Sequence, residues 1–183
     1  SNYVIQLDAT TNRNMTWDSA ATNTVAGWDQ GASYTGTVTF ATAYTGGFTN
    51  FTVTGDATLT GGRWTHQDNS NLQVNRLNVT VNGYFTLGTN TTISADNLGY
   101  DSTFGPGAGK RGNGGEAGGG GHGGNGQMSG VAVWGYAYDD YAAPVALGSG
   151  GGNGYGSGAN GGGAIRLRIG GNATLNGTIT ANG

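Results

Sequence analysis

The 183-residue chain contains no cysteine, only two prolines and a single glutamate, Glu116. The lack of cysteine excludes disulfides, thiol chemistry and zinc sites built on Cys. Two prolines are too few for a collagen triple helix, although 40 residues are Gly. Long helices favour Ala, Leu, Glu, Lys and Arg, whereas Thr, Asn and Val accompany the glycines here. The sequence therefore predicts an all-β fold.

Charge is also scarce, with seven Lys and Arg against ten Asp and Glu and a net charge of −3. Nucleic acids and anionic membrane surfaces recruit clustered basic side chains, so neither is expected as a partner. No apolar run approaches the roughly 20 residues that span a bilayer. We therefore expect no membrane insertion.

Hydrophobic residues alternate with polar ones in three segments outside the Gly-rich region: 51–54, 77–82 and 165–170. Period-two alternation is typical of strands with one buried face. A Gly-x-x-Thr-Leu pattern recurs at 55–59, 83–87 and 171–175. Short strands and turns at a recurring period indicate a solenoid of stacked coils. An antiparallel sandwich of short strands is the alternative reading of the same alternation.

The predicted organisation is one β-solenoid domain over residues 1–183, a parallel β-helix. Its N-terminal strand and cap would cover 1–47, with Trp17 and Trp28 closing the first coil. Coils would follow at 48–98 and a final coil at 164–183. The Gly-rich stretch 99–163 would loop out of one coil as an insertion, because it accounts for the longer spacing before the third copy of the repeat.

Within this insertion, glycines recur at every third position. Three residues per turn is the period of the polyproline-II helix, and Gly on the inward line lets backbones approach closely. We therefore predict packed polyglycine-II helices, and a flexible Gly-rich linker is the alternative. The predicted tract comprises Gly109, Gly112, Gly115, Gly118, Gly121 and Gly124.

An aromatic segment at 131–144 separates two Gly-rich tracts and is predicted to project as a loop. Exposed Trp and Tyr are common anchors in protein and sugar recognition. The alternative is that these rings fold back onto the glycine layer. The candidate binding residues are Trp134, Tyr136, Tyr138, Asp139, Asp140 and Tyr141.

No catalytic motif is present. The acidic residues occur in turn contexts, and His66 and His122 are isolated. We therefore expect no enzyme, no metal and no cofactor. Asn-x-Ser/Thr sequons mark candidate glycosylation sites on a secreted chain. They are Asn14, Asn50, Asn78, Asn90, Asn172 and Asn176.

The succession of Gly-rich motifs at 99–109, 118–125, 144–152, 161–167 and 175–183 resembles the Gly-rich β-helix modules of large secreted and cell-surface bacterial proteins. This resemblance implies a right-handed parallel β-helix, an extracellular location and no enzyme activity. The phased glycines are separately similar to the polyglycine-II tips of phage tail-fibre adhesins.

The leading functional hypothesis is an extracellular structural protein that assembles with copies of itself into a fibre. Open strand edges can pair with another chain, and the candidate assembly strand is Tyr3, Val4, Ile5, Gln6 and Leu7, with the uncapped coil 175–183 at the other end. The chain could equally be one module of a longer protein. The alternative function is an adhesin that binds glycans or a receptor through 131–144. Thr-x-Thr pairs make ice binding a third hypothesis.

Overall fold

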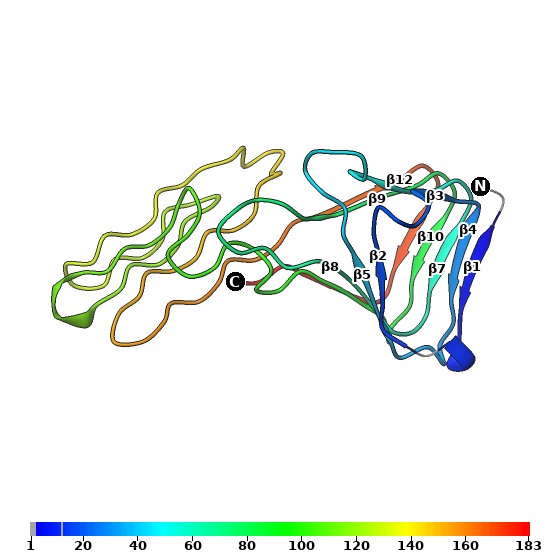
Figure 1. The fold of residues 1–183 in the computed structure, drawn as a ribbon, viewed down its shortest axis with the longest axis horizontal. Coiled ribbons are helices and arrows are strands. Elements are labelled where there is room, and N and C mark those ends of the chain that lie inside the picture. The colour runs from blue at the N-terminus through cyan, green and yellow to red at the C-terminus, as the bar shows by residue number, and fades with distance from the viewer. Residues whose placement is uncertain (1–2, 12) are drawn as a thin grey trace. The chain divides into compact units, whose positions relative to one another are not determined.

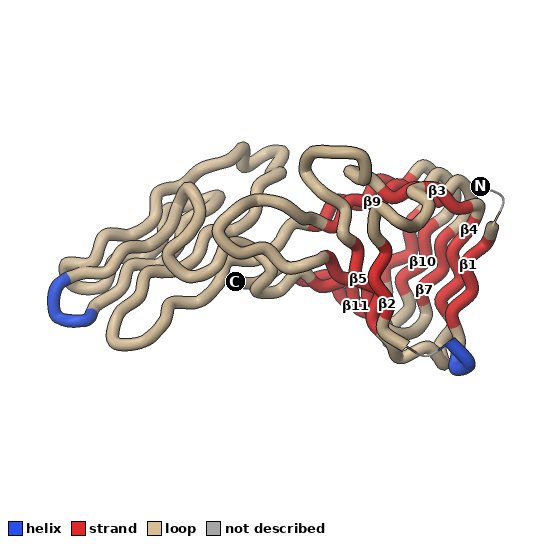
Figure 2. Tube along the Cα trace, in the orientation of Figure 1, coloured by secondary structure: helices blue, strands red, loops and turns tan. Residues whose placement is uncertain are grey.

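The computed structural model describes residues 3–11 and 13–183; part of the predicted N-terminal cap lies outside them. It divides into two compact units. Unit 1 comprises residues up to 67, 75–94 and 165–180, and unit 2 comprises 68–74, 95–164 and 181–183. All fourteen strands lie in unit 1, and unit 2 is built from irregular extended segments (Figure 2).

Unit 1 is a parallel β-helix with three sheets (Figure 1). Sheet A contains β1 (Val4–Leu7), β4 (Gly27–Gln30), β7 (Ala57–Leu59), β10 (Phe85–Leu87) and β13 (Ala173–Leu175). Sheet B contains β2 (Met15–Trp17), β5 (Thr37–Phe40), β8 (Arg63–His66), β11 (Thr92–Ser94) and β14 (Thr178–Thr180). Sheet C contains β3 (Thr24–Val25), β6 (Phe51–Val53), β9 (Leu77–Val81) and β12 (Ile165–Ile169).

The chain visits sheets A, B and C in turn, and each visit to all three completes one coil. Every pairing between these strands is parallel, which excludes the antiparallel sandwich. The predicted repeats stack in register: Leu59, Leu87 and Leu175 are direct neighbours across β7, β10 and β13. The parallel β-helix prediction is confirmed.

The core of unit 1 is aromatic in its first coils and aliphatic later. Trp28 packs edge-on against Trp64 and Phe51, with ring centroids 5.4 and 5.6 Å apart. Further along the stack, Leu87 and Ile93 are fully buried. Trp28 lies in the second coil, between Ile5 and Ala57 of the neighbouring strands, and its ring packs edge-on against Trp17 of the first coil with centroids 5.4 Å apart. That the two tryptophans close the first coil stays a prediction.

One polar side chain sits inside this core. Gln30 occupies the inward position that Leu59 holds in the next coil. Its Oε1 accepts hydrogen bonds from Trp28 Nε1 at 3.3 Å and Trp64 Nε1 at 3.0 Å, and its Nε2 donates to the Gly61 carbonyl. A buried polar group is tolerated when its hydrogen bonds are satisfied, so Gln30 ties the two indoles to the backbone.

Most of unit 2, residues 95–164, lies between β11 and β12 in the sequence and contains the 3-10 turn at Asn113–Gly115. Its segments are joined by backbone hydrogen bonds, such as those from Gly109 to Gly150 (3.1 Å) and from Gly152 to Gly118 (2.8 Å). These bonds join the two Gly-rich tracts. The bonding groups approach closely because the residues carry no side chain.

Candidate functional site

The C-terminal end of the β-helix leaves core positions uncovered. Leu59 and Leu87 are fully buried, but Leu175, at the same position in the last coil, is 53% exposed. Ile93 is likewise buried, whereas its neighbour Ile179 is 41% exposed. These apolar side chains lie in line with the core but have no further coil to pack against in the described residues.

The N-terminal end shows the same feature. Ile5 in β1 and Met15 and Trp17 in β2 pack against the core yet remain half-buried, while Tyr3 and Val4 are 74% and 56% exposed. The predicted assembly strand 3–7 forms β1 from Val4 onward and pairs with β4. Its opposite edge faces no strand of the described chain.

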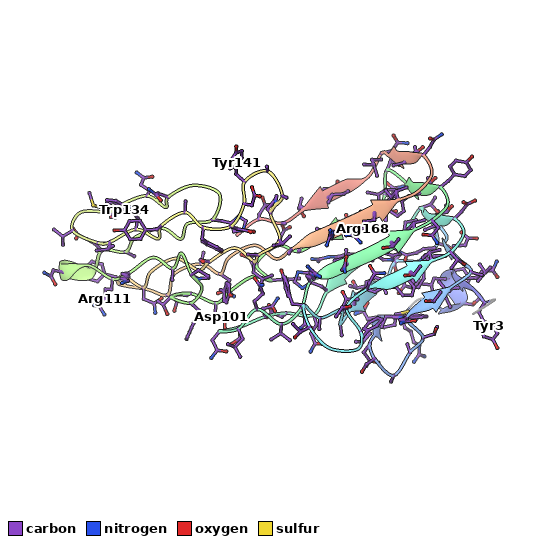
Figure 3. The ribbon with its side chains drawn as sticks, turned by 90° about the horizontal axis from the view of Figure 1, so that it is seen from above. Tyr3, Asp101, Arg111, Trp134, Tyr141 and Arg168 are labelled. Carbon is purple, nitrogen blue, oxygen red and sulfur yellow. The ribbon has the colours of Figure 1, made fainter. Side chains whose placement is uncertain are left out.

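Six strand edges are open in this way. The outer strands are β1, β2 and β3 at one end and β13, β14 and β12 at the other. On β12, Ile165, Leu167 and Ile169 are half-buried, and Arg166 and Arg168 are exposed on the opposite face. Figure 3 shows Arg168 on β12, at the far side of the stack from Tyr3. Sequence reasoning did not assign β12 to assembly, although its Ile-Arg-Leu-Arg-Ile alternation was a usable signal.

The predicted binding loop is divided into two parts. Trp134 and Tyr136 lie together, with ring centroids 6.2 Å apart; Tyr136 is 64% exposed, and the indole N–H of Trp134 has no hydrogen-bond partner in the described chain. Tyr141 is also exposed, at 88%. Trp134 and Tyr141 are labelled in Figure 3. Tyr136 and Tyr141 therefore present aromatic surface to solvent, whereas Trp134 is half-buried and its indole nitrogen is enclosed.

The other part supports the loop. The Tyr138 hydroxyl donates to the Leu147 carbonyl and accepts from Ser149 Oγ at 2.9 Å, and burial raises the pKa of Tyr138. The Tyr138 ring packs edge-on against His122. Asp140 Oδ1 accepts from the Ala142 amide, which closes a local turn. These hydrogen bonds fix the loop's own backbone; Tyr138 is half-buried and Asp140 is exposed.

Asp139 organises the following turn. Its Oδ2 accepts hydrogen bonds from the amides of Val145 and Ala146, both at 2.7 Å, and its Oδ1 accepts from Asp140 at 2.9 Å. The bond from Ala146 is the largest cause of a lowered Asp139 pKa, with the other amides and His122, 3.5 Å away, adding to it. The structure therefore uses Asp139 as an anion that caps backbone N–H groups.

The six phased glycines do not lie on one straight helix. The turn at Asn113–Gly115 reverses the chain and brings Arg111 opposite Ala117 in an antiparallel bridge. The reversal occurs there because Gly114 and Gly115 adopt positive φ angles of 79° and 85°. The predicted tract is thus split, with Gly109 and Gly112 before the turn and Gly118, Gly121 and Gly124 after it.

These glycines differ in how closely other atoms of the chain approach them. A Cβ on Gly109 would lie 1.9 Å from the Gly118 carbonyl oxygen, and one on Gly118 would lie 2.1 Å from that of Val133. Gly112 and Gly121 are similarly crowded, by Ala132 and by Gly135 and Tyr136, whereas no atom lies within 4 Å of a Cβ on Gly124. Gly109, Gly112, Gly118 and Gly121 require Gly for packing, and Gly124 does not.

The sequons differ in accessibility. Asn78 is only 6% exposed, and its Nδ2 donates to the Thr49 carbonyl at 2.6 Å. Asn50 is half-buried and donates to Thr52 Oγ1. A glycan on Asn78 would displace this packing. The exposed sequons are Asn14, Asn90, Asn172 and Asn176.

Among residues 3–11 and 13–183, no cluster of three or more His, Asp or Glu side chains could hold a metal ion. In the same residues, no helix has the length and apolar character of a membrane span. His66 is buried at the end of β8, where its Nδ1 lies 2.8 Å from the Gln67 carbonyl oxygen. His122 lies beside Tyr138, apart from His66 in the other unit.

Unit 1 thus has the architecture of a parallel β-helix, and no other strand of the described residues covers its outer strands. Comparison with protein-family models, with curated proteins and with solved structures found no match.

Proposed function

We propose that this chain is a non-enzymatic extracellular structural subunit that assembles head to tail into a filament through the two ends of its β-helix. The carrying observation is the contrast between Leu87, fully buried, and Leu175, 53% exposed at the equivalent position of the last coil. A second copy on this end would bury that surface and pair the open backbone edges. Because the two ends differ, the contact is heterologous and propagates.

Unit 2 would form a bundle of polyglycine-II helices on each subunit. A β-strand directs its backbone groups to two sides, whereas a helix with three residues per turn directs them to several neighbours. Residues 118–121 bond in this way, to Gly107, Lys110, Gln127, Gly135 and Gly152. This pattern supports the polyglycine-II conformation and argues against a flexible linker.

Sedimentation velocity on the purified 183-residue chain over a wide concentration range tests the assembly. We expect concentration-dependent growth of large species. The variant Leu175→Asp should suppress that growth, because it would bury a carboxylate in the contact. Thr86→Asp, on the outward face of sheet A between Thr58 and Thr174, is the matched control and should assemble normally. A chain that stays monomeric at the highest concentration overturns the proposal.

A second candidate function is glycan binding by Trp134 and Tyr136. Their adjacent rings and the exposure of Tyr136 favour it, because aromatic faces stack on sugars. A glycan array would show binding that Trp134→Ala abolishes and that Tyr155→Ala, an exposed aromatic elsewhere in unit 2, leaves intact. Absence of binding across a broad array counts against this function.

A further inference from the structure

Resting on the proposed assembly, we infer that successive copies are rotated by about one third of a turn, so that β1 of one copy pairs with β12 of the preceding copy. In the same contact, β2 pairs with β13 and β3 with β14. The partner surface is thus a second copy in a defined register, with Arg166 and Arg168 of β12 facing the polar side of β1.

The order of the sheets requires the rotation. The chain runs through sheets A, B and C in turn, and its last strands are β13 in sheet A and β14 in sheet B. The next position along this path lies in sheet C, against the open edge of β12. The first strand of the following copy, β1, would occupy that position and cover the open edge of β12.

Stacking without rotation leaves a gap. If β1 paired with β13 and β2 with β14, sheet C would lack one rung, because β12 belongs to the coil before β13. The apolar side chains of β12 would then stay uncovered, and its backbone N–H and C=O groups would lose their partners on one side. Unpaired backbone groups enclosed by an interface are unfavourable, so the rotated arrangement is the better one.

Strand lengths fit the rotated arrangement. β1 has four residues and β12 has five, β2 and β13 have three each, and β3 has two against three in β14. Each open edge at one end therefore meets an edge of similar length at the other.

The alternation of side chains also matches. Ile5 and Leu7 of β1 point inward, as do Ile165, Leu167 and Ile169 of β12, the latter three only half-buried. A pleated pair must keep inward residues opposite inward residues. Two registers meet this condition: Leu7 opposite Leu167, or Leu7 opposite Ile169.

The residues that would lie opposite Arg166 and Arg168 favour the first register, with Leu7 opposite Leu167. With Leu7 opposite Leu167, Gln6 lies opposite Arg166, and Asp8 lies opposite Arg168. The second register would instead set the apolar Val4 opposite Arg166. Opposite charges directly across a strand pair are favourable and apolar–charged pairs are not. Asp8 also accepts hydrogen bonds from the Thr10 amide and hydroxyl, which hold its carboxylate in place.

Disulfide trapping tests the register, because the natural chain has no cysteine. Paired strands lie about 4.8 Å apart, within the Cα separation that a disulfide spans. The variant Gln6→Cys/Arg166→Cys reports the rotated contact. The variant Gln6→Cys/Thr174→Cys reports the unrotated one, since Gln6 and Thr174 occupy one outward line of sheet A. Within one copy each pair is separated by several strands.

We expect a ladder of crosslinked oligomers on non-reducing gels for Gln6→Cys/Arg166→Cys, and none beyond dimers for the single-cysteine variants. A ladder from Gln6→Cys/Thr174→Cys alone overturns the rotation while leaving the assembly itself standing. A native chain that remains monomeric, with no ladder from either pair, overturns both.

Charge reversal provides an independent readout. Arg168→Asp should raise the concentration needed for assembly by roughly threefold or more, and adding Asp8→Arg to this variant should lower it again. Arg63→Asp, at an exposed residue of β8 in the middle of the stack, is the control for net charge. Equal effects of Arg168→Asp and Arg63→Asp, without rescue, would contradict the assigned register.

Discussion

Leu87 and Leu175 are direct neighbours in sheet A, yet the first is fully buried and the second is 53% exposed. The two residues occupy equivalent positions in consecutive coils, so the difference reports the absence of a covering coil in the described chain. It gives the β-helix an apolar end where other surfaces of unit 1 carry Thr and Asn.

This difference in burial predicts that shortening the two leucines to alanine lowers the free energy of unfolding by different amounts. Leu87→Ala should lower the free energy of unfolding by about 2–5 kcal/mol, because it opens a cavity in the core. Leu175→Ala should cost less than about 1 kcal/mol in the monomer but should weaken assembly. Urea denaturation at low and high protein concentration measures both. Similar losses for the two variants in the monomer would show that position 175 is already covered.

The hydrogen bonds of Gln30 predict that a polar residue at this buried position stabilises the fold more than an apolar one would. Gln30→Leu would continue the leucine stack but leave the indole N–H groups of Trp28 and Trp64 without their acceptor. The expected loss in unfolding free energy is at least about 2 kcal/mol. Leu87→Met is the control for side-chain shape and should cost less than about 1.5 kcal/mol. A Gln30→Leu variant as stable as the parent would refute this role.

Glycine packing in unit 2 can be tested with two alanine substitutions. Gly118→Ala places a methyl group against the Val133 carbonyl and should destabilise unit 2 by about 1–3 kcal/mol. Gly124→Ala meets no atom within 4 Å and should change stability by less than about 0.5 kcal/mol. Hydrogen exchange of the amides at 107–152 reports the difference. Equal protection in both variants would argue for a loose, linker-like unit 2.

The hydrogen bonds that Asp139 accepts predict that the turn formed by the Val145 and Ala146 amides loosens in acid. Its hydrogen-bonded carboxylate has a lowered pKa in the folded chain, so its stabilising effect is present above the unfolded pKa of about 3.9. That effect is lost as the pH falls through the lower folded pKa. Exchange of the Val145 and Ala146 amides should therefore speed up, relative to the intrinsic rate, only in strong acid.

Asp139→Asn should loosen the turn in part at neutral pH. An amide oxygen can still accept from Val145 and Ala146, but these bonds lose their charge assistance, and the Nδ2 donor would face the Asp140 amide. Asn also tolerates the positive φ of 67° at this position. Asp140→Asn is the matched control, since its acceptor bond to Ala142 can be kept by an amide oxygen. Unchanged protection of Val145 and Ala146 in Asp139→Asn would contradict this role.

The strands of the later coils were predictable because their apolar residues repeat in register. Phe51 and Val53, in the last strand of the second coil, alternate with threonines and are both fully buried. The first strand of that coil, β4, was not recognised, because Gln30 stands where the repeat has Leu. The hydrogen bonds that Gln30 accepts from Trp28 and from Trp64, 34 residues away, are visible only in three dimensions.

The candidate sites were predictable in part. Strand 4–7 followed from its own alternation, and the exposure of Tyr136 and Tyr141 agrees with a projecting aromatic segment. The structural role of Asp139 did not follow, because it depends on amides six and seven residues away. The regular spacing of the six glycines did not indicate the chain reversal at Gly114 and Gly115, because Gly permits both extended and left-handed backbone.

Cryo-electron microscopy of the purified chain at high concentration tests head-to-tail stacking most directly. Fourteen strands shared among three sheets, at about 4.8 Å per rung, predict filaments with an axial rise of roughly 22 Å per subunit and a rotation near one third of a turn. Fields containing only separate single subunits would contradict the account.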